Sequence, residues 1–292
     1  MQHHRPKVSV IVPFYNEARH IGRCADALLS QSLPRDQYEV ILVDNDSNDG
    51  SATLAQRPGV TVLHEPRRSS YAARNRGVEH ARGDLLVFTD GDCAPEHGWL
   101  ETILVRFEDP TLALLIGERR FANDTWLMEL LRLYEGERAR LLTYGYTNNM
   151  AMRAEVFRAV GPFEEIPRGA DTSLFLRALA LHPEGVVFAP EVVVRHLEVK
   201  GLGHHLRKKV IYGLASRTAR AAAGRDASSP PSQLVAAALT HLTHHVPALS
   251  KTIAAEHGLS VAARATLIGL GWANYLAYGL GRLGAELKHR PR

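Results

Sequence analysis

The sequence predicts an α/β fold with a mainly parallel central sheet, followed by a helical C-terminal extension. Two observations lead to this prediction. Apolar, β-branched runs alternate with helical patterns through the first two-thirds of the chain, and the remainder is basic and then rich in Ala and Leu. Strands and helices that alternate at this spacing form right-handed crossovers between parallel strands. We therefore expect one α/β domain over residues 1–200 and a basic, helical extension over residues 201–292.

The predicted strands are short apolar runs bounded by polar residues. Residues 8–14 have the sequence VSVIVPF, which is almost continuously apolar, as expected of a strand that is buried on both faces. Comparable runs follow at 40–43, 60–63 and 85–89, and less regular ones at 112–116, 148–152 and 185–194.

The predicted helices have apolar residues spaced three and four apart. In the first, which Asn16 is expected to cap, one apolar stripe contains Ile21, Cys24, Ala25, Leu28 and Leu29. Other helices are predicted at 69–81, 99–107, 126–142 and 171–181. In the extension, a basic helical stretch at 201–223 precedes a predicted linker or helix break at 228–232 and a helical remainder.

The composition excludes several classes of protein. With 45% hydrophobic and 23% charged residues, the 292-residue chain is neither disordered nor collagen-like. A net charge of +4 is too small for a dedicated nucleic-acid binder, so no nucleic-acid partner is expected. Two distant cysteines and a polar N-terminus without a secretory signal favour a cytoplasmic location.

Acidic residues follow three of the predicted strands, and Glu17 comes after the first of them. Asp44 ends the second strand, and Asp90 and Asp92 follow the fourth, at the edge where open parallel sheets bind ligands. Asp-Gly pairs are also common in simple turns, but carboxylates that converge beyond buried strands suit Mn²⁺ or Mg²⁺. Gly91 would let the backbone bend so that both carboxylates reach one site. Neither a Rossmann nor a P-loop glycine motif is present, so a metal would have to hold the phosphates.

Four segments together resemble successive motifs of the family 2 glycosyltransferases, which have the GT-A fold. They are VSVIVPFYNE at 8–17, ILVDNDSNDGS at 41–51, ARNRG at 73–77 and LVFTDGD at 86–92. The resemblance implies transfer of a sugar from a nucleotide-sugar donor to an acceptor hydroxyl, with inversion at the anomeric carbon and with Mn²⁺ or Mg²⁺ as cofactor. It also implies a set of donor-binding residues, namely Pro13, Tyr15, Glu17, Asp44, Arg74 and Asp90.

The resemblance assigns the metal ligands and the catalytic base as well. Asp92 and Asp90 match the metal-binding pair, and His196 stands where many members of the family have a third ligand. Asp171 occupies the position of the catalytic base, which must take the proton of the attacking hydroxyl. Because Asp171 begins a predicted helix, the helix dipole is expected to favour its ionised form. The family often has Glu-Asp there and this chain has Ala-Asp, so Glu164 and Glu165 are alternative bases.

The extension suggests contact with a membrane. Residues 195–225 contain eight Lys and Arg, which form either a solvated face or a surface for anionic lipid or diphosphate. The uncharged run at 265–281 is shorter than the about 20 residues of a spanning helix, so it is expected to be a packed or interfacial helix. The enzyme would then lie at the inner face of the membrane, and its acceptor would be lipid-linked or part of the cell envelope. Alternatively, the extension would mediate self-association. A non-catalytic nucleotide-sugar-binding protein and a metal-dependent nucleotidyltransferase are the alternative functions.

Overall fold

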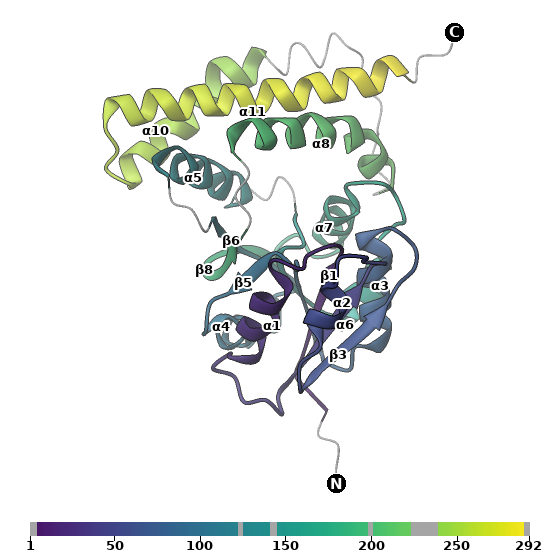
Figure 1. Cartoon of the computed structure of the whole chain (residues 1–292). Helices are drawn as coiled ribbons and strands as arrows, with labels where there is room; N and C mark the ends of the chain where they lie inside the picture. Colours follow the sequence, from purple (N-terminus) through teal and green to yellow (C-terminus); the bar gives the residue numbers. More distant parts are fainter. Residues whose placement is uncertain (1–4, 122–124, 141–144, 198–200, 223–238, 289–292) are drawn as a thin grey trace. The chain divides into compact units, whose positions relative to one another are not determined.

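The computed structural model describes residues 5–121, 125–140, 145–197, 201–222 and 239–288 (Figure 1). The chain divides into two compact units. The first combines Met1–Ala122, Leu142–Glu165 and Ala170–Glu198, and the second combines Asn123–Leu141, Ile166–Gly169 and Val199–Arg292. The second unit therefore takes a helix, α5 (Trp126–Arg140), from inside the residue range of the predicted first domain. The predicted linker at 228–232 lies outside the described residues.

The first unit is built around an eight-stranded sheet with the order β3-β2-β1-β4-β7-β6-β8-β5 (Figure 1). Its parallel half contains β3 (Val60–His64), β2 (Tyr38–Asp44), β1 (Val8–Phe14) and β4 (Leu85–Thr89). The other half contains β7 (Asn149–Arg153), β6 (Leu114–Phe121), β8 (Val186–His196) and β5 (Cys93–Pro95). The α/β fold is confirmed, but β7 runs antiparallel to both of its neighbours, so the sheet is mixed.

Helices cover both faces of the sheet around β1, which explains why β1, β2 and β4 are almost entirely buried and apolar, whereas the edge strand β3 is only partly buried. On one face, Val8, Val10 and Val12 pack with the buried stripe of α1 (Ile21–Leu29). On the other face, α3 (Ser70–His80) approaches so closely that a Cβ on Gly77 would lie 2.5 Å from a methyl carbon of Ile11. The remaining helices of the unit are α2 (Ser51–Ala55), α4 (Trp99–Arg106), α6 (Ala154–Val160) and α7 (Ala170–Leu181).

The predicted helix cap at Asn16 is wrong. Helix α1 begins after His20, whose side chain makes no capping hydrogen bond. Asn16 instead has φ of +52°, a left-handed conformation that Asn tolerates, and its Oδ1 accepts a hydrogen bond from the Asn48 amide. Helix α3, by contrast, has a side-chain cap, because Ser69 Oγ accepts a hydrogen bond from the Ala72 amide.

The second unit consists of helices. Besides α5 it contains α8 (Leu202–Ala222), a π-helical turn η1 (His241–His245), α10 (Val246–Glu256) and α11 (Val261–Lys288). Helices α8 and α11 cross at two glycines, where a Cβ on Gly213 would lie 2.1 Å from the Tyr278 carbonyl and one on Gly281 2.0 Å from the Val210 carbonyl. Their backbones are thus nearly in contact, so α8 covers one face of α11. Among the described residues, no helix combines the length and apolar character needed to cross a bilayer.

The basic stretch in α8 is not simply a solvated face. Lys209 forms an ion pair of 2.9 Å with Glu135 of α5, and the two side chains are only 12% and 7% exposed. One of the predicted surface charges therefore helps to hold the helices of this unit together.

Candidate active site

The loops that follow β1 and β2 are hydrogen-bonded to each other. The Asn16 amide donates to Ser47 Oγ at 3.0 Å, and the Glu17 amide donates to Ser51 Oγ at 2.8 Å. The Asn48 amide returns a bond of 2.9 Å to Asn16 Oδ1. These contacts hold the carboxyl ends of two neighbouring strands in one fixed arrangement, which is the edge of the sheet where ligands are expected.

The predicted donor-binding residues of these loops differ in exposure. Pro13 is buried within β1, whereas Tyr15 is exposed and has the guanidinium of Arg68 at 3.8 Å from its ring centroid. Asp44 is nearly buried at the end of β2 and accepts a hydrogen bond of 3.1 Å from the Ser47 amide. The second oxygen of Asp44 lies 3.4 Å from His64 Nδ1.

Arg74 and Asp90 form a pair between helix α3 and the end of β4. Arg74 Nη2 donates to Asp90 Oδ1 at 2.5 Å, and the Arg74 side chain is only 5% exposed. The Nε of Arg74 is buried and has no hydrogen-bond partner among the described residues. A buried guanidinium with an unused donor beside an acidic residue is suited to an anionic ligand such as a diphosphate.

Gly91 is required for close packing. A Cβ at this position would lie 2.8 Å from Phe14 Cβ and 3.5 Å from Glu17 Cγ, so only glycine lets the end of β4 approach the end of β1. Gly91 is not among the residues with positive φ. Contrary to the expectation from the sequence, Gly91 therefore does not serve to bend the backbone. It leaves room for the side chains that pack against it.

Asp92 and His196 lie together, as expected of two metal ligands. Asp92 Oδ2 is 3.3 Å from His196 Nε2, and the side chains are 16% and 14% exposed. The antiparallel register of β5 with β8 places Cys93 opposite His196, and one potential ligand atom from each of these three residues lies within 4.8 Å of the others. A carboxylate and an imidazole suit Mn²⁺, whereas Asp90 is outside this group and paired with Arg74.

Asp171 is half-buried in the first turn of α7. Its Oδ1 accepts hydrogen bonds from the Thr172 amide at 2.9 Å and from the Tyr71 hydroxyl at 3.3 Å. Burial raises the pKa of the Asp171 carboxyl, against the opposing effects of these two donors and of the charge of Arg74, while the charge of Asp90 adds to the rise. Burial therefore outweighs the helix dipole that was expected to favour the ionised form, and makes the carboxylate a stronger base.

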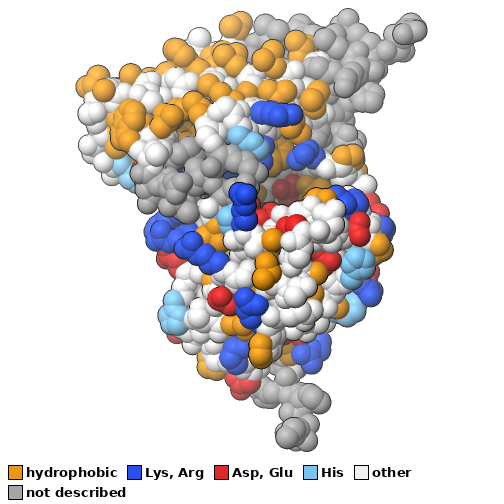
Figure 2. Space-filling model, viewed as in Figure 1, with side chains coloured by type: hydrophobic (Ala, Val, Ile, Leu, Met, Phe, Trp, Pro, Cys, Tyr) orange, Lys and Arg blue, Asp and Glu red, His pale blue; other side chains and the backbone are white. Residues whose placement is uncertain are grey.

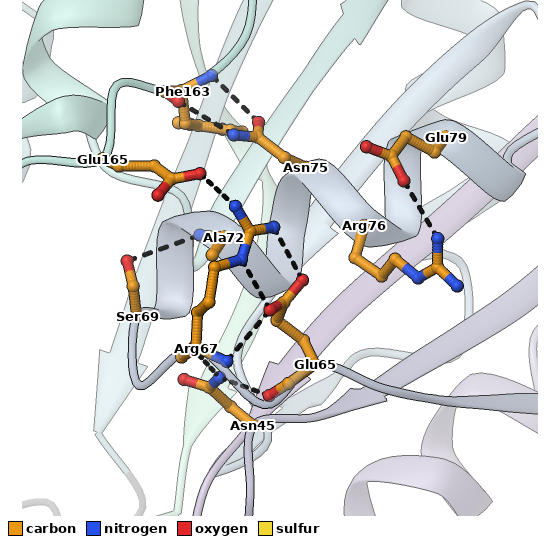
Figure 3. Close-up of polar contacts among 10 residues, drawn as sticks. All are labelled: Asn45, Glu65, Arg67, Ser69, Ala72, Asn75, Arg76, Glu79, Phe163 and Glu165. Carbon is orange, nitrogen blue, oxygen red and sulfur yellow. Dashed lines mark hydrogen bonds and ion pairs between the residues drawn. The ribbon is translucent and has the colours of Figure 1, made fainter.

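The alternative bases are both engaged in ion pairs. Glu164 Oε1 lies 3.0 Å from Arg177 Nη2 and accepts from Ser173 Oγ at 2.8 Å. Glu165 Oε1 lies 2.5 Å from Arg67 Nη1 (Figure 3). An arginine thus neutralises each of these carboxylates, whereas no ion pair of Asp171 is found among the described residues, which makes Asp171 the better candidate for that role.

The arginine that pairs with Glu165 belongs to a network that no sequence motif indicated (Figure 3). Arg67 binds Glu65 through two hydrogen bonds of 2.8 Å, and these lower the pKa of Glu65 to about 2. Nearby, Asn75 of α3 donates to the Phe163 carbonyl at 2.8 Å and accepts from the Phe163 amide at 3.0 Å. The network joins the loop after β3 and helix α3 to the segment that precedes α7.

Three kinds of comparison place this architecture among known proteins. Residues 9–160 match the family model described as glycosyl transferase family 2. Glycosyltransferase AglE of Haloferax volcanii is 32% identical over 221 residues, which are 71% of this chain and 72% of that protein. The pre-mycofactocin glycosyltransferase of Mycobacterium tuberculosis is 30% identical over 227 residues, which are 70% of this chain and 46% of the relative.

Two solved structures resemble the chain. Mannosyltransferase PcManGT from Pyrobaculum calidifontis, in complex with GDP-Man and Mn²⁺, has a TM-score of 0.66 and 24% identity and covers 98% of this chain and 88% of its own. TarS of S. aureus has a TM-score of 0.56 and 16% identity, and the match covers 97% of this chain and 55% of TarS. The likeness to glycosyltransferase structures confirms the GT-A fold that the sequence motifs implied.

Proposed function

Since this chain belongs to glycosyl transferase family 2 and is a glycosyltransferase, we propose that it is metal-dependent and inverting and moves a sugar from a nucleotide-sugar donor to an acceptor hydroxyl. The family excludes the alternative of a nucleotidyltransferase. The observation that carries the proposal is the meeting of three acidic groups at one edge of the sheet. Asp92 lies beside His196, Asp90 beside Arg74, and the charges of Arg74 and Asp90 act on Asp171.

Asp92 and His196 are the residues that would hold Mn²⁺ or Mg²⁺. When bound, a divalent ion stabilises the negative charge that develops on the departing nucleoside diphosphate. The chain's own contribution is positional, because β5 and β8 fix the two side chains through their ladder and the Leu197 amide donates to the Asp92 carbonyl at 2.7 Å. Asp90, oriented by Arg74, is left to contact the donor near its ribose.

Asp171 would act as the base. In an inverting transfer, one carboxylate takes the proton of the acceptor hydroxyl while that oxygen attacks the anomeric carbon and the bond to the diphosphate breaks. Both hydrogen bonds to Asp171 end on Oδ1, so Oδ2 is the oxygen that receives the proton. Retention by double displacement would require a carboxylate that attacks the anomeric carbon and forms a covalent intermediate, and Glu164 and Glu165 are already paired with arginines.

The donor is best sought first among GDP-sugars, because the mannosyltransferase with the similar fold was solved with GDP-Man and Mn²⁺. Calorimetry of GDP and UDP with the full chain, with and without Mn²⁺, tests the proposal. We expect affinity that requires the metal and that falls at least 10-fold in Asp92→Asn, because the amide carries no charge. Asp26→Asn, at an exposed carboxylate of α1 that pairs with Arg57, is the matched control and should bind normally. Metal-independent binding, or normal binding by Asp92→Asn, would contradict the metal site.

We further propose that the second unit contacts the membrane from the cytoplasmic side and that the acceptor is lipid-linked. Trp272, Leu276 and Leu280 recur every four residues on α11 and are 44%, 50% and 66% exposed. Figure 2 shows hydrophobic side chains gathered over this helix. An exposed apolar stripe with an aromatic residue on a helix, next to a basic helix without acidic residues, suits the surface of an anionic bilayer. Self-association through the same stripe is the alternative.

A further inference from the structure

Tyr71 is held rigidly by its surroundings. The residue is 9% exposed, and its ring stacks on the ring of the buried Phe163, with centroids 6.0 Å apart and planes at 20°. Phe163 is in turn fixed by the two hydrogen bonds between its backbone and Asn75, which lies one helical turn after Tyr71 on α3 (Figure 3). Neither the ring nor its hydroxyl can move far without breaking this packing.

The hydroxyl of Tyr71 reaches the carboxylate proposed as the base. It donates to Asp171 Oδ1 at 3.3 Å, and the Thr172 amide donates to the same oxygen at 2.9 Å. Two donors on one oxygen fix the plane of the carboxylate and leave Oδ2 as the oxygen with the free lone pairs. The tyrosine and the amide come from different helices, α3 and α7, so that both the direction and the rotation of the carboxylate are constrained.

The same helix also holds the acidic residue of the donor site. Arg74 is three residues after Tyr71, on the same face of α3, and pairs with Asp90 at the end of β4. Helix α3 thus sets the position of Asp90 through Arg74 and that of Asp171 through Tyr71. A rigid helix that contacts both groups keeps the distance and the orientation between the donor site and the base constant.

From this geometry we propose that Tyr71 is a positioning residue of the transfer reaction, which orients the carboxylate of Asp171 so that Oδ2 faces the acceptor hydroxyl. The proposal rests on the proposed role of Asp171 as the base. It assigns no contact between Tyr71 and either substrate.

Tyr71→Phe removes the hydroxyl and keeps the stacked ring, so the packing against Phe163 is retained. We expect kcat to fall about 10-fold or more, because a hydrogen bond to a charged group is lost. The Kd of the nucleoside diphosphate with Mn²⁺, measured by calorimetry, should not change.

The pH profile gives a second readout, which a structural tyrosine would not change. The charged and titratable groups that face Asp171 are Tyr71 and Arg74 from α3 and Asp90 from the end of β4. Arg74 and Asp90 remain in Tyr71→Phe, so the loss of a donor to the ionised carboxylate should move the acidic limb of kcat/KM to higher pH.

Tyr38→Phe is the matched control. Tyr38 is 2% exposed and its hydroxyl donates to the Leu28 carbonyl at 2.9 Å, remote from the acidic residues of the site. This variant should lose thermal stability but keep both kcat and the pH profile. Phe163→Leu, which keeps the tyrosine hydroxyl and removes the stacked ring, should shift kcat and the acidic limb in the same direction as Tyr71→Phe and by less.

Asp171→Asn separates the two proposals. Turnover that survives in Asp171→Asn overturns the assignment of the base itself. Turnover that is lost in Asp171→Asn, with kcat and the acidic limb unchanged in Tyr71→Phe, overturns only the role of Tyr71. A Tyr71→Phe variant that loses stability alone, as Tyr38→Phe should, likewise shows that the hydroxyl is merely a satisfied buried group.

Discussion

At the residue scale, the surroundings of two carboxylates shift their pKa values in opposite directions. Burial raises the pKa of Asp171, whereas hydrogen bonds from Arg67 hold that of Glu65 at about 2. A strong base requires the first environment and a permanent ion pair requires the second. The pH dependence of stability should therefore differ in sign between the two residues.

Asp171→Asn should separate chemistry from binding and from stability. Turnover is expected to fall by about 10² to 10⁴ with an unchanged Kd for the nucleoside diphosphate. Because the native pKa of Asp171 lies above its unfolded value of 3.8, the carboxyl favours the native state below that value, and this effect is lost as the pH rises through the native pKa. The Asn variant should thus unfold at a higher temperature than the parent at pH 7, and this advantage should disappear near pH 3. A lower Tm at pH 7 would contradict the desolvated carboxylate.

Glu65→Gln should behave in the opposite way. The pKa of Glu65 is lowered from 4.5, so its ion pair stabilises the native state above that pH and the stabilisation is lost as the pH falls toward 2. The variant should have a lower Tm than the parent at pH 7, with a difference that shrinks below pH 4. The control is Glu79→Gln, since Glu79 pairs with Arg76 at 3.2 Å on the exposed side of the same region and such pairs contribute little (Figure 3). Equal changes in Tm for both variants would show that the ion pair of Glu65 with Arg67 stabilises the protein no more than the exposed pair of Glu79 with Arg76.

At the scale of elements, glycines decide where two segments can meet. Gly91 lets the ends of β1 and β4 approach, Gly77 lets α3 lie on β1, and Gly213 and Gly281 let α8 cross α11. In each case a Cβ would lie closer than 3.0 Å to another atom, so a side chain would force the elements apart.

Gly281→Ala tests the crossing of α8 and α11. Its Cβ would lie 2.0 Å from the Val210 carbonyl, so the helices must separate, at a cost of about 1–3 kcal/mol or more in the free energy of unfolding. Gly269→Ala, on the same helix with no atom within 4 Å of the added Cβ, is the control and should be stabilising by up to about 1 kcal/mol. Urea denaturation followed by circular dichroism measures both. Similar effects of the two changes would mean that the crossing is not tightly packed.

At the scale of the whole molecule, the two units carry different parts of the proposed function. The first contains all of the predicted donor, metal and catalytic residues, and the second contains the exposed stripe of α11. In the second unit, Leu267 and Leu270 are buried on the face of α11 opposite this stripe. The run at 265–281 therefore has apolar side chains on both the packed and the exposed face of the helix.

Membrane contact should depend on this stripe. The full chain is expected to co-sediment with vesicles that contain anionic lipid, less so as salt rises, because attraction of basic residues to the surface is screened. Leu276→Gln combined with Leu280→Gln should abolish co-sedimentation and leave nucleotide binding intact. Val105→Gln, at a residue of α4 that is 58% exposed in the first unit, is the control. If the parent ignores both anionic and neutral vesicles and the double variant converts a dimer to a monomer, the stripe is a subunit contact instead.

The sequence by itself determined the strands of the parallel half, the fold class and the family. Strands β1, β2 and β4 are almost entirely buried, so their apolar runs are nearly continuous and easily recognised, whereas β3 at the edge of the sheet is only partly buried. The acidic residues that follow β2 and β4 belong to ordered motifs, and these motifs led to Asp44, Asp90 and Asp92, whereas Asp171 was assigned by its position in the family resemblance. Local periodicity and motif order suffice for features of this kind, because each depends on neighbours in the chain.

Only the tertiary structure decided how these residues are paired and which segments oppose one another. The antiparallel direction of β7, the position of Cys93 opposite His196 and the crossing at Gly213 and Gly281 each depend on register or packing between distant segments. The hydrogen bond from Tyr71 to Asp171 joins residues 100 positions apart. Such contacts leave no periodic pattern in either segment. A helix or strand would show the same sequence pattern if it packed against a different partner, so the pattern does not identify the partner.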